Sequence, residues 1–289
     1  MKTVTDKKGA HKQPGILYIV ATPIGNLEDI TFRAVRVLKA VKLIAAEDTR
    51  QTRKLLNAYG IATPQTSLFD RNEKVKSGYL IKKIEEGFDI AYVSDAGTPG
   101  VSDPGFVLIN EAITHGVQVV PIPGVSAVIT ALCASGLPMT SFVFNGFLPQ
   151  KPDKRKGVLL SIKDDPRTSV FYESPKRLCA ALQDISDVLG NRNIVVAREL
   201  TKVFEEIVRG SVDDVMGILS NRVIKGEITL IVGGQAKTPA QYSRQELRKR
   251  IEKLKKTEDL SVKDMADRLS DEFAISRRTV YQQILKSNE

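Results

Sequence analysis

Short apolar runs separated by helical patterns organise the first 120 residues of the chain. Residues 16–20 (ILYIV) contain no polar position, which is typical of a strand that is buried on both faces of a sheet. Apolar runs at residues 42–46, 90–93 and 117–122 predict three further strands.

Helical patterns fill the intervals between these runs. After the first run, Asp29 is the predicted N-cap of a helix that continues to Val41 and has apolar residues on one face. After the second, Asp48 or Thr49 is the predicted cap of a helix that ends before Gly60. Strands that alternate with helices predict an α/β domain with a mainly parallel sheet.

The third interval begins with a loop rich in glycine and proline, residues 94–105 (SDAGTPGVSDPG), which we call the central loop. Three glycines and two prolines require the backbone to turn and expose its amides. In open α/β sheets, ligands bind outside the carboxyl ends of the strands, where this loop is expected. The central loop is therefore the leading candidate for a ligand site, and a connection without a ligand is the alternative.

A second strand end of this kind follows residue 122. Ser126 is predicted to cap a helix that ends at Gly136, and Gly124, Ser126 and Ala127 are small enough for a ligand to approach the backbone. The pattern changes after this helix, so we place a domain boundary within residues 122–140. Three strand-like runs at residues 169–172, 193–197 and 228–232, with a helix at 176–189, predict a second α/β domain.

The last 50 residues have a different character. Residues 244–256 form a basic amphipathic pattern, and Ser261 with Asp264 predicts a capped helix whose Met265, Ala266 and Leu269 point inward. A turn at 274–276 precedes a helix at 277–285 with Val280, Tyr281 and Ile284 buried. Two arginines at the start of the last helix favour a helix-turn-helix that binds nucleic acid, and a dimerisation or capping unit is the alternative.

The predicted organisation is therefore a disordered tail (1–13), an N-terminal α/β domain (14–122), a C-terminal α/β domain (123–236) and a helical RNA-binding module (241–289). No repeat of 20 to 50 residues is visible, which excludes a solenoid.

Composition narrows the possible functions. The net charge of +9 favours an anionic partner such as nucleic acid, and the run of residues 151–156 (KPDKRK) could contact phosphates. No apolar run approaches the roughly 18 residues that span a bilayer, and the polar N-terminus lacks a signal-peptide core, so we expect no membrane and a cytoplasmic location. Cys133 and Cys179 lie in apolar helical patterns and are predicted to be reduced core residues, and only two histidines disfavour a zinc site.

The turn after the first strand tests a dinucleotide-binding interpretation. Its sequence, residues 22–26 (TPIGN), contains no Gly-x-Gly-x-x-Gly, so the backbone that normally contacts a pyrophosphate is absent. An ordinary Rossmann oxidoreductase is disfavoured.

Five segments together resemble a known family. They are residues 17–27 (LYIVATPIGNL), 45–50 (AAEDTR), 93–99 (VSDAGTP), 146–149 (GFLP) and 171–174 (FYES). In this order they are similar to the bacterial 16S ribosomal RNA (cytidine) 2′-O-ribose methyltransferases of the tetrapyrrole-methylase-like (class III) family, which use S-adenosyl-L-methionine. The resemblance covers residues 16 to about 235 and extends into the C-terminal module.

The resemblance implies two α/β domains with the cofactor in the cleft between them, a homodimer, and a cytidine of the decoding region of 16S rRNA, in the small ribosomal subunit, as the substrate. It also implies a set of cofactor-binding residues: Thr22, Pro23, Ile24, Ser94, Asp95, Ala96, Gly97, Thr98, Ser126, Ala127, Phe171, Tyr172, Ala197, Glu227 and Ile228. Relatives that act on tetrapyrroles carry Gly-Asp-Pro where this chain has Gly97-Thr98-Pro99, which argues against a tetrapyrrole substrate.

Methyl transfer to a ribose hydroxyl requires in-line alignment and a base that accepts the hydroxyl proton. The acids at predicted strand ends are Glu47, Asp48, Asp95, Glu173 and Glu199. Each of them could instead be a helix cap or an ion-pair partner, most clearly Asp48 before Arg50. The sequence does not choose among the five.

Two other functions remain open at this stage. One is a methyltransferase of the same fold that acts on a tetrapyrrole or another small molecule. The other is a regulator that binds nucleic acid and senses a ligand through its α/β part.

Overall fold

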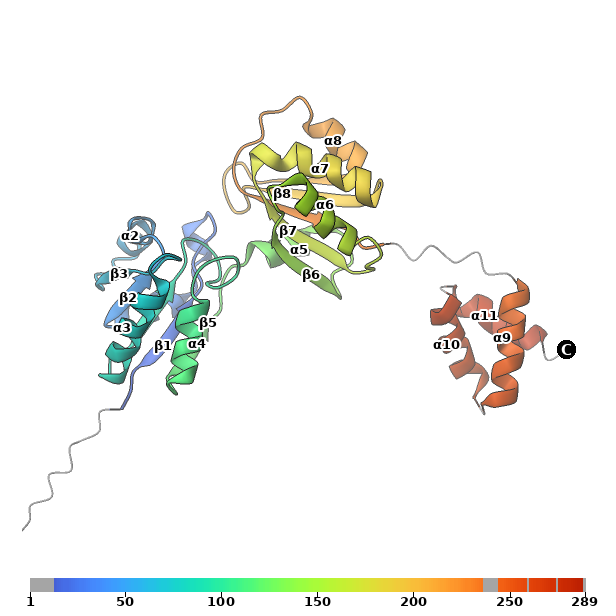
Figure 1. Cartoon of the computed structure of the whole chain (residues 1–289), viewed down its shortest axis with the longest axis horizontal. Coiled ribbons are helices and arrows are strands. Elements are labelled where there is room, and N and C mark those ends of the chain that lie inside the picture. The colour runs from blue at the N-terminus through green and yellow to red at the C-terminus, as the bar shows by residue number, and fades with distance from the viewer. Residues whose placement is uncertain (1–12, 236–243, 259, 274, 288–289) are drawn as a thin grey trace, which may run out of the picture. The chain divides into compact units, whose positions relative to one another are not determined.

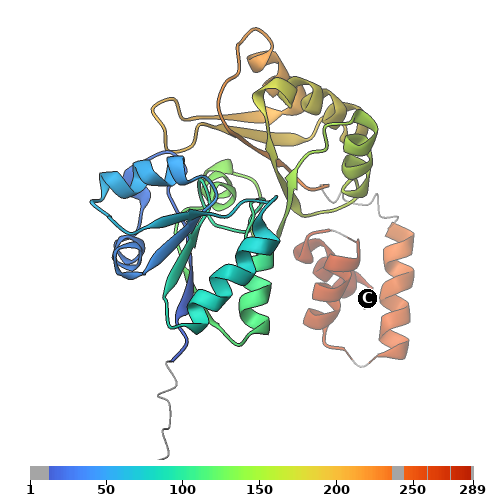
Figure 2. The same cartoon turned by 60° about the vertical axis from the view of Figure 1, so that its left-hand side comes forward.

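The computed structural model describes residues 13–235, 244–258, 260–273 and 275–287. The predicted tail, apart from Gln13, and most of the linker before the C-terminal module lie outside these ranges. The chain divides into two compact units. One unit contains both β-sheets, and the other contains the C-terminal helices together with the short segment Asp164–Pro166 (Figure 1 and Figure 2).

The first sheet is parallel throughout, as predicted, with the strand order β3-β2-β4-β1-β5. Its central strand β4 is buried at every position, in agreement with its unbroken apolar sequence IAYV. The strands are β1 (Ile16–Val20), β2 (Leu43–Ala46), β3 (Gln65–Ser67), β4 (Ile90–Val93) and β5 (Gln118–Ile122).

Helices pack on both faces of this sheet and create two apolar cores. One core includes Leu38 and Leu56, and the other includes Leu80 and Leu108. The helices are α1 (Phe32–Ala40), α2 (Thr49–Ala58), α3 (Glu73–Glu85) and α4 (Phe106–Thr114). Asp48 caps α2, as predicted, and accepts the backbone N–H of Arg50.

The predicted start of the first helix is wrong by two residues. Asp29 belongs to a separate 3-10 turn, η1 (Leu27–Asp29), and the extended backbone of Ile30 ends that turn. The helix consequently begins after Thr31, whose hydroxyl oxygen accepts the N–H of Ala34 at 3.0 Å. Thr31, and not Asp29, is the cap of α1.

The second sheet is mixed, with the strand order β6-β7-β10-β8-β9. Only β6 and β7 run parallel, and the other neighbours are antiparallel. The strands are β6 (Phe142–Phe147), β7 (Thr168–Glu173), β8 (Asn193–Arg198), β9 (Glu206–Ser211) and β10 (Ile228–Val232). The edge strand β9 was not predicted, because its sequence EIVRGS carries a glycine and charges.

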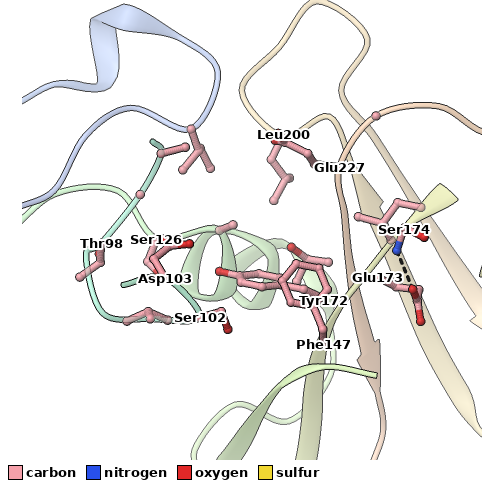
Figure 3. Close-up of a pocket in the computed structure, with 18 of the residues that line it drawn as sticks. Thr98, Ser102, Asp103, Ser126, Phe147, Tyr172, Glu173, Ser174, Leu200 and Glu227 are labelled. Carbon is pink, nitrogen blue, oxygen red and sulfur yellow. Dashed lines mark hydrogen bonds between the residues drawn. The ribbon is translucent and has the colours of Figure 1, made fainter. Parts of the chain in front are cut away.

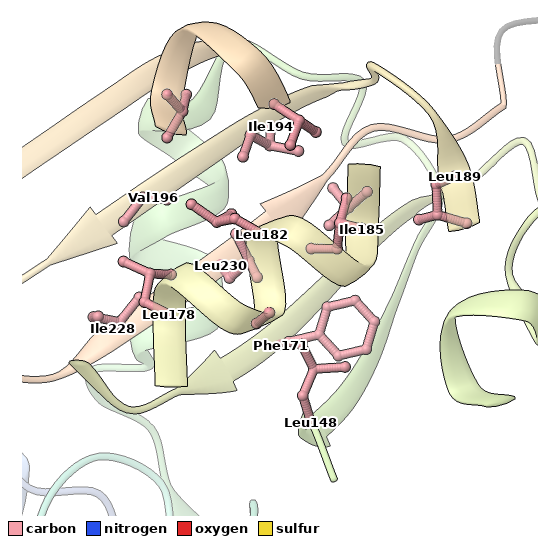
Figure 4. Packing of buried hydrophobic residues seen from close by; sticks show 14 of the residues in the cluster. Leu148, Phe171, Leu178, Leu182, Ile185, Leu189, Ile194, Val196, Ile228 and Leu230 are labelled. Atoms are coloured by element: carbon pink, nitrogen blue, oxygen red, sulfur yellow. The ribbon is translucent and has the colours of Figure 1, made fainter. Parts of the chain in front are cut away.

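Helices cover the two faces of the second sheet unequally. The helices α6 (Pro152–Ser161), α7 (Pro175–Leu189) and α8 (Val212–Leu219) pack on the face that contains Leu230 and Phe171 (Figure 4). On the other face, α5 (Ala127–Ser135) packs against Val170, Val195 and Ile231. The alternation of side chains along each strand therefore supplies both cores.

The second unit is a helical cluster with its own core. It consists of α9 (Arg244–Thr257), α10 (Val262–Phe273) and α11 (Arg277–Lys286), as the pattern predicted. Val280 and Ile284 are buried, but the prediction for Tyr281 is wrong, because 37% of this residue is exposed. The predicted turn is described only at residues 275 and 276.

Two further expectations concern the cysteines and the membrane. Cys133 and Cys179 are free thiols, but both are exposed and not in the core, because each lies on the outward face of an otherwise apolar helix. Within the described ranges, no helix has the length and apolar character needed to cross a membrane.

Candidate active site

A cavity of about 330 Å³ lies in the first unit at the carboxyl end of β4 (Figure 3). This volume is at the lower end of the range for small-molecule sites, about 300–1,000 Å³. Residues from the central loop, the start of α5 and the strands β7 and β10 form its wall. They are Ile24, Ala96, Gly97, Thr98, Val101, Ser102, Asp103, Ser126, Ala127, Phe147, Tyr172, Glu173, Ser174, Pro175, Leu200, Gly226, Glu227, Ile228 and Thr229.

Backbone hydrogen bonds hold the central loop beside the turn after β1. Thr22 and Gly97 form an isolated antiparallel bridge, in which each N–H donates to the carbonyl of the other at 2.9 Å. Gly97 has a φ of +77°, and a Cβ at this position would lie 3.4 Å from Cγ2 of Ile24. The positive φ therefore favours glycine in the loop, and a side chain at this position would begin in contact with Ile24.

The N-terminus of α5 contributes backbone N–H groups that receive no capping hydrogen-bond acceptor from the Ser126 side chain. Ser126 occupies the N-cap position, but its side chain makes no cap hydrogen bond, so this part of the sequence prediction is wrong. The extended backbone of Ser126 places the residue in the cavity wall instead. The first amides of α5 lack a side-chain partner there, and an anionic or polar ligand group can fill that role.

Aromatic rings form the side of the cavity opposite the central loop. The rings of Phe144 and Phe147 lie 5.0 and 5.4 Å from the ring of Tyr172, measured between centroids. Phe147 is 56% exposed, although it is a large apolar side chain. Burial and the nearby Asp103 raise the pKa of the Tyr172 hydroxyl, which keeps this group neutral at ordinary pH.

Asp103 is the acid of the central loop that lines the cavity. Its carboxyl is half-buried, and this desolvation raises its pKa to about 6. The nearby Ser94 hydroxyl opposes the rise in the pKa, and the negative charges of Asp95 and Asp70 add to it. Asp103 was absent from the acids proposed on sequence, since it stands inside the loop and not at a strand end.

Two other acids of the cavity wall are held by cations. The Glu173 carboxylate is buried, accepts the N–H of Ser174 at 2.6 Å and pairs with Arg177 at 2.6 Å. Glu227 pairs with Lys202 at 3.1 Å and is 76% exposed at its side chain.

The remaining proposed acids lie outside the cavity wall. Glu199 accepts hydrogen bonds from Lys202 and from the N–H of Glu227, and Lys202 holds its pKa below the ordinary value. The Asp48 side chain is engaged by Arg50, which lowers its pKa to about 2.

Glu47 and Asp95 form part of the backbone framework behind the central loop. Glu47 accepts the N–H of Asp95 at 3.2 Å, and Asp95 accepts the N–H of Asp48 at 2.9 Å. Burial raises the pKa of both carboxyls. Among the described residues, no group of acids, histidines and cysteines has an arrangement that could hold a metal ion.

The residues expected to bind a cofactor divide into two sets. Those in the cavity wall are Ile24, Ala96, Gly97, Thr98, Ser126, Ala127, Tyr172, Glu227 and Ile228. Those outside it are Thr22, Pro23, Ser94, Asp95, Phe171 and Ala197. Phe171 points into the opposite core because it neighbours Tyr172 on a strand, and Ala197 is fully buried.

Sequence reasoning missed several residues of the wall. They are Val101, Ser102, Asp103, Phe147, Ser174, Pro175, Leu200, Gly226 and Thr229. Sequence features could have indicated two of these residues: Asp103 is the second Asp of the central loop, and Phe147 is the aromatic residue of the segment GFLP.

The basic run at residues 151–156 is partly structural. Arg155 is buried and pairs with Asp184 at 2.6 Å, and Lys156 pairs with Asp184 and Asp187. Lys151 and Lys154 are exposed and remain candidates for contact with phosphate.

Known proteins share this fold and sequence. Residues 16–216 match the family of Tetrapyrrole (Corrin/Porphyrin) Methylases. The solved structures of a cobalt precorrin-4 methyltransferase and of a diphthine synthase superpose with TM-scores of 0.59 and 0.60. They are 18% and 13% identical, cover 75% and 77% of this chain and are themselves covered over 94% and 91%, so they show the fold alone.

Curated relatives are much more similar. The ribosomal RNA small subunit methyltransferase I of Halalkalibacterium halodurans is 51% identical over 76% of this chain and 76% of its own length. The protein of the same name from Vibrio cholerae is 46% identical over 96% of this chain and 97% of its own length. The chain therefore belongs to the tetrapyrrole methylase family and, within it, to the group of ribosomal RNA small subunit methyltransferases I.

Proposed function

We propose that this protein transfers a methyl group from S-adenosyl-L-methionine to the 2′-hydroxyl of a cytidine ribose in the decoding region of 16S ribosomal RNA. The observation that carries the proposal is the cavity, which joins a backbone cradle on one side to aromatic rings on the other. The names of the curated relatives support ribosomal RNA as the substrate.

The cavity wall fits the chemistry of this cofactor. The uncapped amides at the start of α5 suit a carboxylate such as that of the methionine end. Ile24, Leu200 and Ile228 offer apolar surface for a nucleoside. When bound, the cofactor supplies a methyl group on a positively charged sulfur.

The chain's own residues then have three tasks. The central loop and the start of α5 fix the donor, and the rings of Phe147 and Tyr172 offer a stacking surface for an unstacked base. Together they align the acceptor oxygen, which contributes most when the reacting atoms lie in line.

In this proposal, positive charge on the protein binds the RNA backbone, and the shape of the RNA and of the cavity selects the nucleotide. Exposed lysines such as Lys151 and Lys154, and the module at residues 241–289, contact phosphates and position the substrate without reading its sequence. Selection of one nucleotide then depends on the shape of the RNA and on the cavity that admits a splayed-out base.

Three-part organisation (14–122, 123–236 and 241–289), a homodimer and a cytoplasmic location belong to the same proposal. The homodimer rests on the family resemblance, whereas the three-part organisation rests on the sequence pattern and the location on composition. Light scattering of the purified protein tests the dimer. A tetrapyrrole substrate is disfavoured by Thr98 in the central loop and by the relatives' names. Those names also disfavour a ligand-sensing regulator.

Methyl transfer to small ribosomal subunits tests the proposal directly. Subunits are incubated with the protein and S-adenosylmethionine labelled at the methyl group, and alkali-resistant linkages are then mapped. A 2′-O-methyl group blocks the hydroxyl that attacks the neighbouring phosphodiester, so one resistant linkage is expected. Label in a methylated base, with every linkage still labile, would refute the ribose assignment and leave the methyltransferase class.

A further inference from the structure

The acids around the cavity differ in whether their charge is already neutralised. Glu173 and Glu227 line the wall but pair with Arg177 and Lys202, respectively. Asp103 lines the same wall, and among the described residues its carboxylate forms no ion pair with a lysine or arginine. A carboxylate engaged by a cation is a weaker base than one without such a partner.

Asp103 lines the cavity on the side of the central loop (Figure 3). It belongs to the central loop, close to Gly97 and Thr98, and its charge reaches the Tyr172 hydroxyl on the opposite side. Figure 3 shows Asp103 on the side of the loop and Phe147 and Tyr172 across from it. An acceptor held against the rings would therefore meet this carboxylate.

We propose that Asp103 is the catalytic base that accepts the proton of the attacking ribose hydroxyl. This inference rests on the proposed function. As the proton moves to the Asp103 carboxylate, the oxygen electron pair forms the bond to the methyl carbon. The electron pair of the breaking carbon–sulfur bond stays on sulfur, which loses its positive charge.

The electrostatic surroundings favour this role at neutral pH. The groups that act on Asp103 from neighbouring elements are Glu47, Asp70, Asp95, Tyr92 and Tyr172. Of these acids, Asp95 and Asp70 add to the effect of burial, and together they raise the pKa of Asp103 to about 6. A base with this pKa is ionised at pH 7 yet accepts a proton more readily than an exposed aspartate does.

Substitution of Asp103 by Asn is the central test, because Asn keeps the size and a hydrogen-bond acceptor but cannot take the proton. A matched control is Asp70→Asn, which removes one negative charge from the same neighbourhood at an exposed residue outside the cavity wall. Asp103→Glu keeps the carboxylate and provides a second variant if the Asn protein does not fold.

Single-turnover methyl transfer to small subunits is measured from pH 5 to 8.5 for each protein. The wild-type rate should rise with pH through about 6, since the ionised carboxylate is the active form. Asp103→Asn should lower the rate by about 100-fold or more and remove this pH dependence, as general bases contribute about 10²–10⁴-fold. Asp103→Glu should recover part of the rate, and Asp70→Asn should stay within a few fold of the wild type.

Two binding and titration measurements separate this role from others. Calorimetry should find S-adenosylmethionine bound equally well by the wild type and Asp103→Asn, and carbon NMR should find an aspartate that titrates near pH 6 only when Asp103 is present. Two results would overturn the assignment of Asp103 as the base and leave the proposed function standing. One is an Asn variant within about threefold of the wild-type rate, and the other is an Asn variant whose cofactor affinity falls as far as its rate. A wild-type protein that methylates no ribose would overturn the proposed function, and the base with it.

Discussion

Removal of the Asp103 charge should make the folded protein more stable while it makes the enzyme inactive. The folded structure raises the pKa of this carboxyl from its ordinary value of 3.8 to about 6, chiefly by burial. The ionised side chain is therefore less favourable in the folded than in the unfolded chain at any pH above about 6. The uncharged amide of the Asp103→Asn variant would escape this cost.

The size of the effect follows from the pKa difference. At about 1.36 kcal/mol for each pKa unit, a rise of this size corresponds to roughly 3 kcal/mol as an upper bound. Because Asp103 is only half-buried and solvent screens its charge, we expect about 1 kcal/mol for Asp103→Asn. A gain of this size raises the midpoint of thermal unfolding by about 2–4 °C in a chain of this length.

The pH dependence gives this prediction its distinguishing sign. Below pH 3.8 the carboxyl is protonated in both states, so the variant and the wild type should be equally stable. The difference should grow between pH 3.8 and 6 and stay constant above that range. Asp70→Asn should show no such pH-dependent gain.

Scanning calorimetry at several pH values measures the effect, and it can resolve separate transitions if the two units unfold independently. The transition to follow is that of the unit with the two sheets. A variant that is equally stable or less stable than the wild type at pH 8 would refute the argument that burial of a charge sets the pKa of Asp103.

Three further outcomes test other parts of the site. Gly97→Leu should abolish binding of S-adenosylmethionine in calorimetry, because the side chain would enter the space beside Ile24. Gly100→Leu is the control: Gly100 has a similar positive φ but lies outside the cavity wall, so this variant should bind the cofactor normally. Unchanged affinity in folded Gly97→Leu would place the cofactor elsewhere. Phe147→Ala should raise KM for ribosomal subunits about tenfold, since a stacked base is worth about 1–3 kcal/mol, and should leave cofactor affinity unchanged; Phe106→Ala, at an exposed ring of α4 outside the cavity wall, is the control. Deletion of residues 241–289 should weaken RNA binding and lower the slope of log affinity against log salt by about 0.7–0.9 for each phosphate that the protein no longer neutralises. An unaltered slope would instead favour a dimerisation or capping unit.

The sequence was sufficient for the fold where the pattern was strong. Unbroken apolar runs such as ILYIV became the buried parallel strands, and the capping pair Ser261–Asp264 starts α10 as expected. Ambiguity arose where two caps competed. Asp29 and Thr31 are both good caps, and only the 3-10 turn at residues 27–29 decides between them.

Side-chain direction was the harder part of the site. The sequence placed Glu173 at a strand end, but it could not show that Arg177, one helical turn further, engages its carboxylate. In the same way, the pattern treated Phe171 and Tyr172 as a pair, although neighbouring residues of a strand face opposite sides. Asp103 was missed because its position depends on the path of a whole loop, which local patterns do not determine.

The bridge between Thr22 and Gly97 has a consequence for how such enzymes can diversify. The two residues bond through their main chains, so that the geometry of this side of the cavity does not depend on most side chains around it. A substitution at Thr98 would remove the hydrogen bond that its hydroxyl donates to the carbonyl of Val125 at 3.2 Å, but it would leave the main-chain bridge in place. Under the proposed function, substitutions at Phe147 and Tyr172 can change the acceptor while the main-chain geometry proposed to hold the donor is kept.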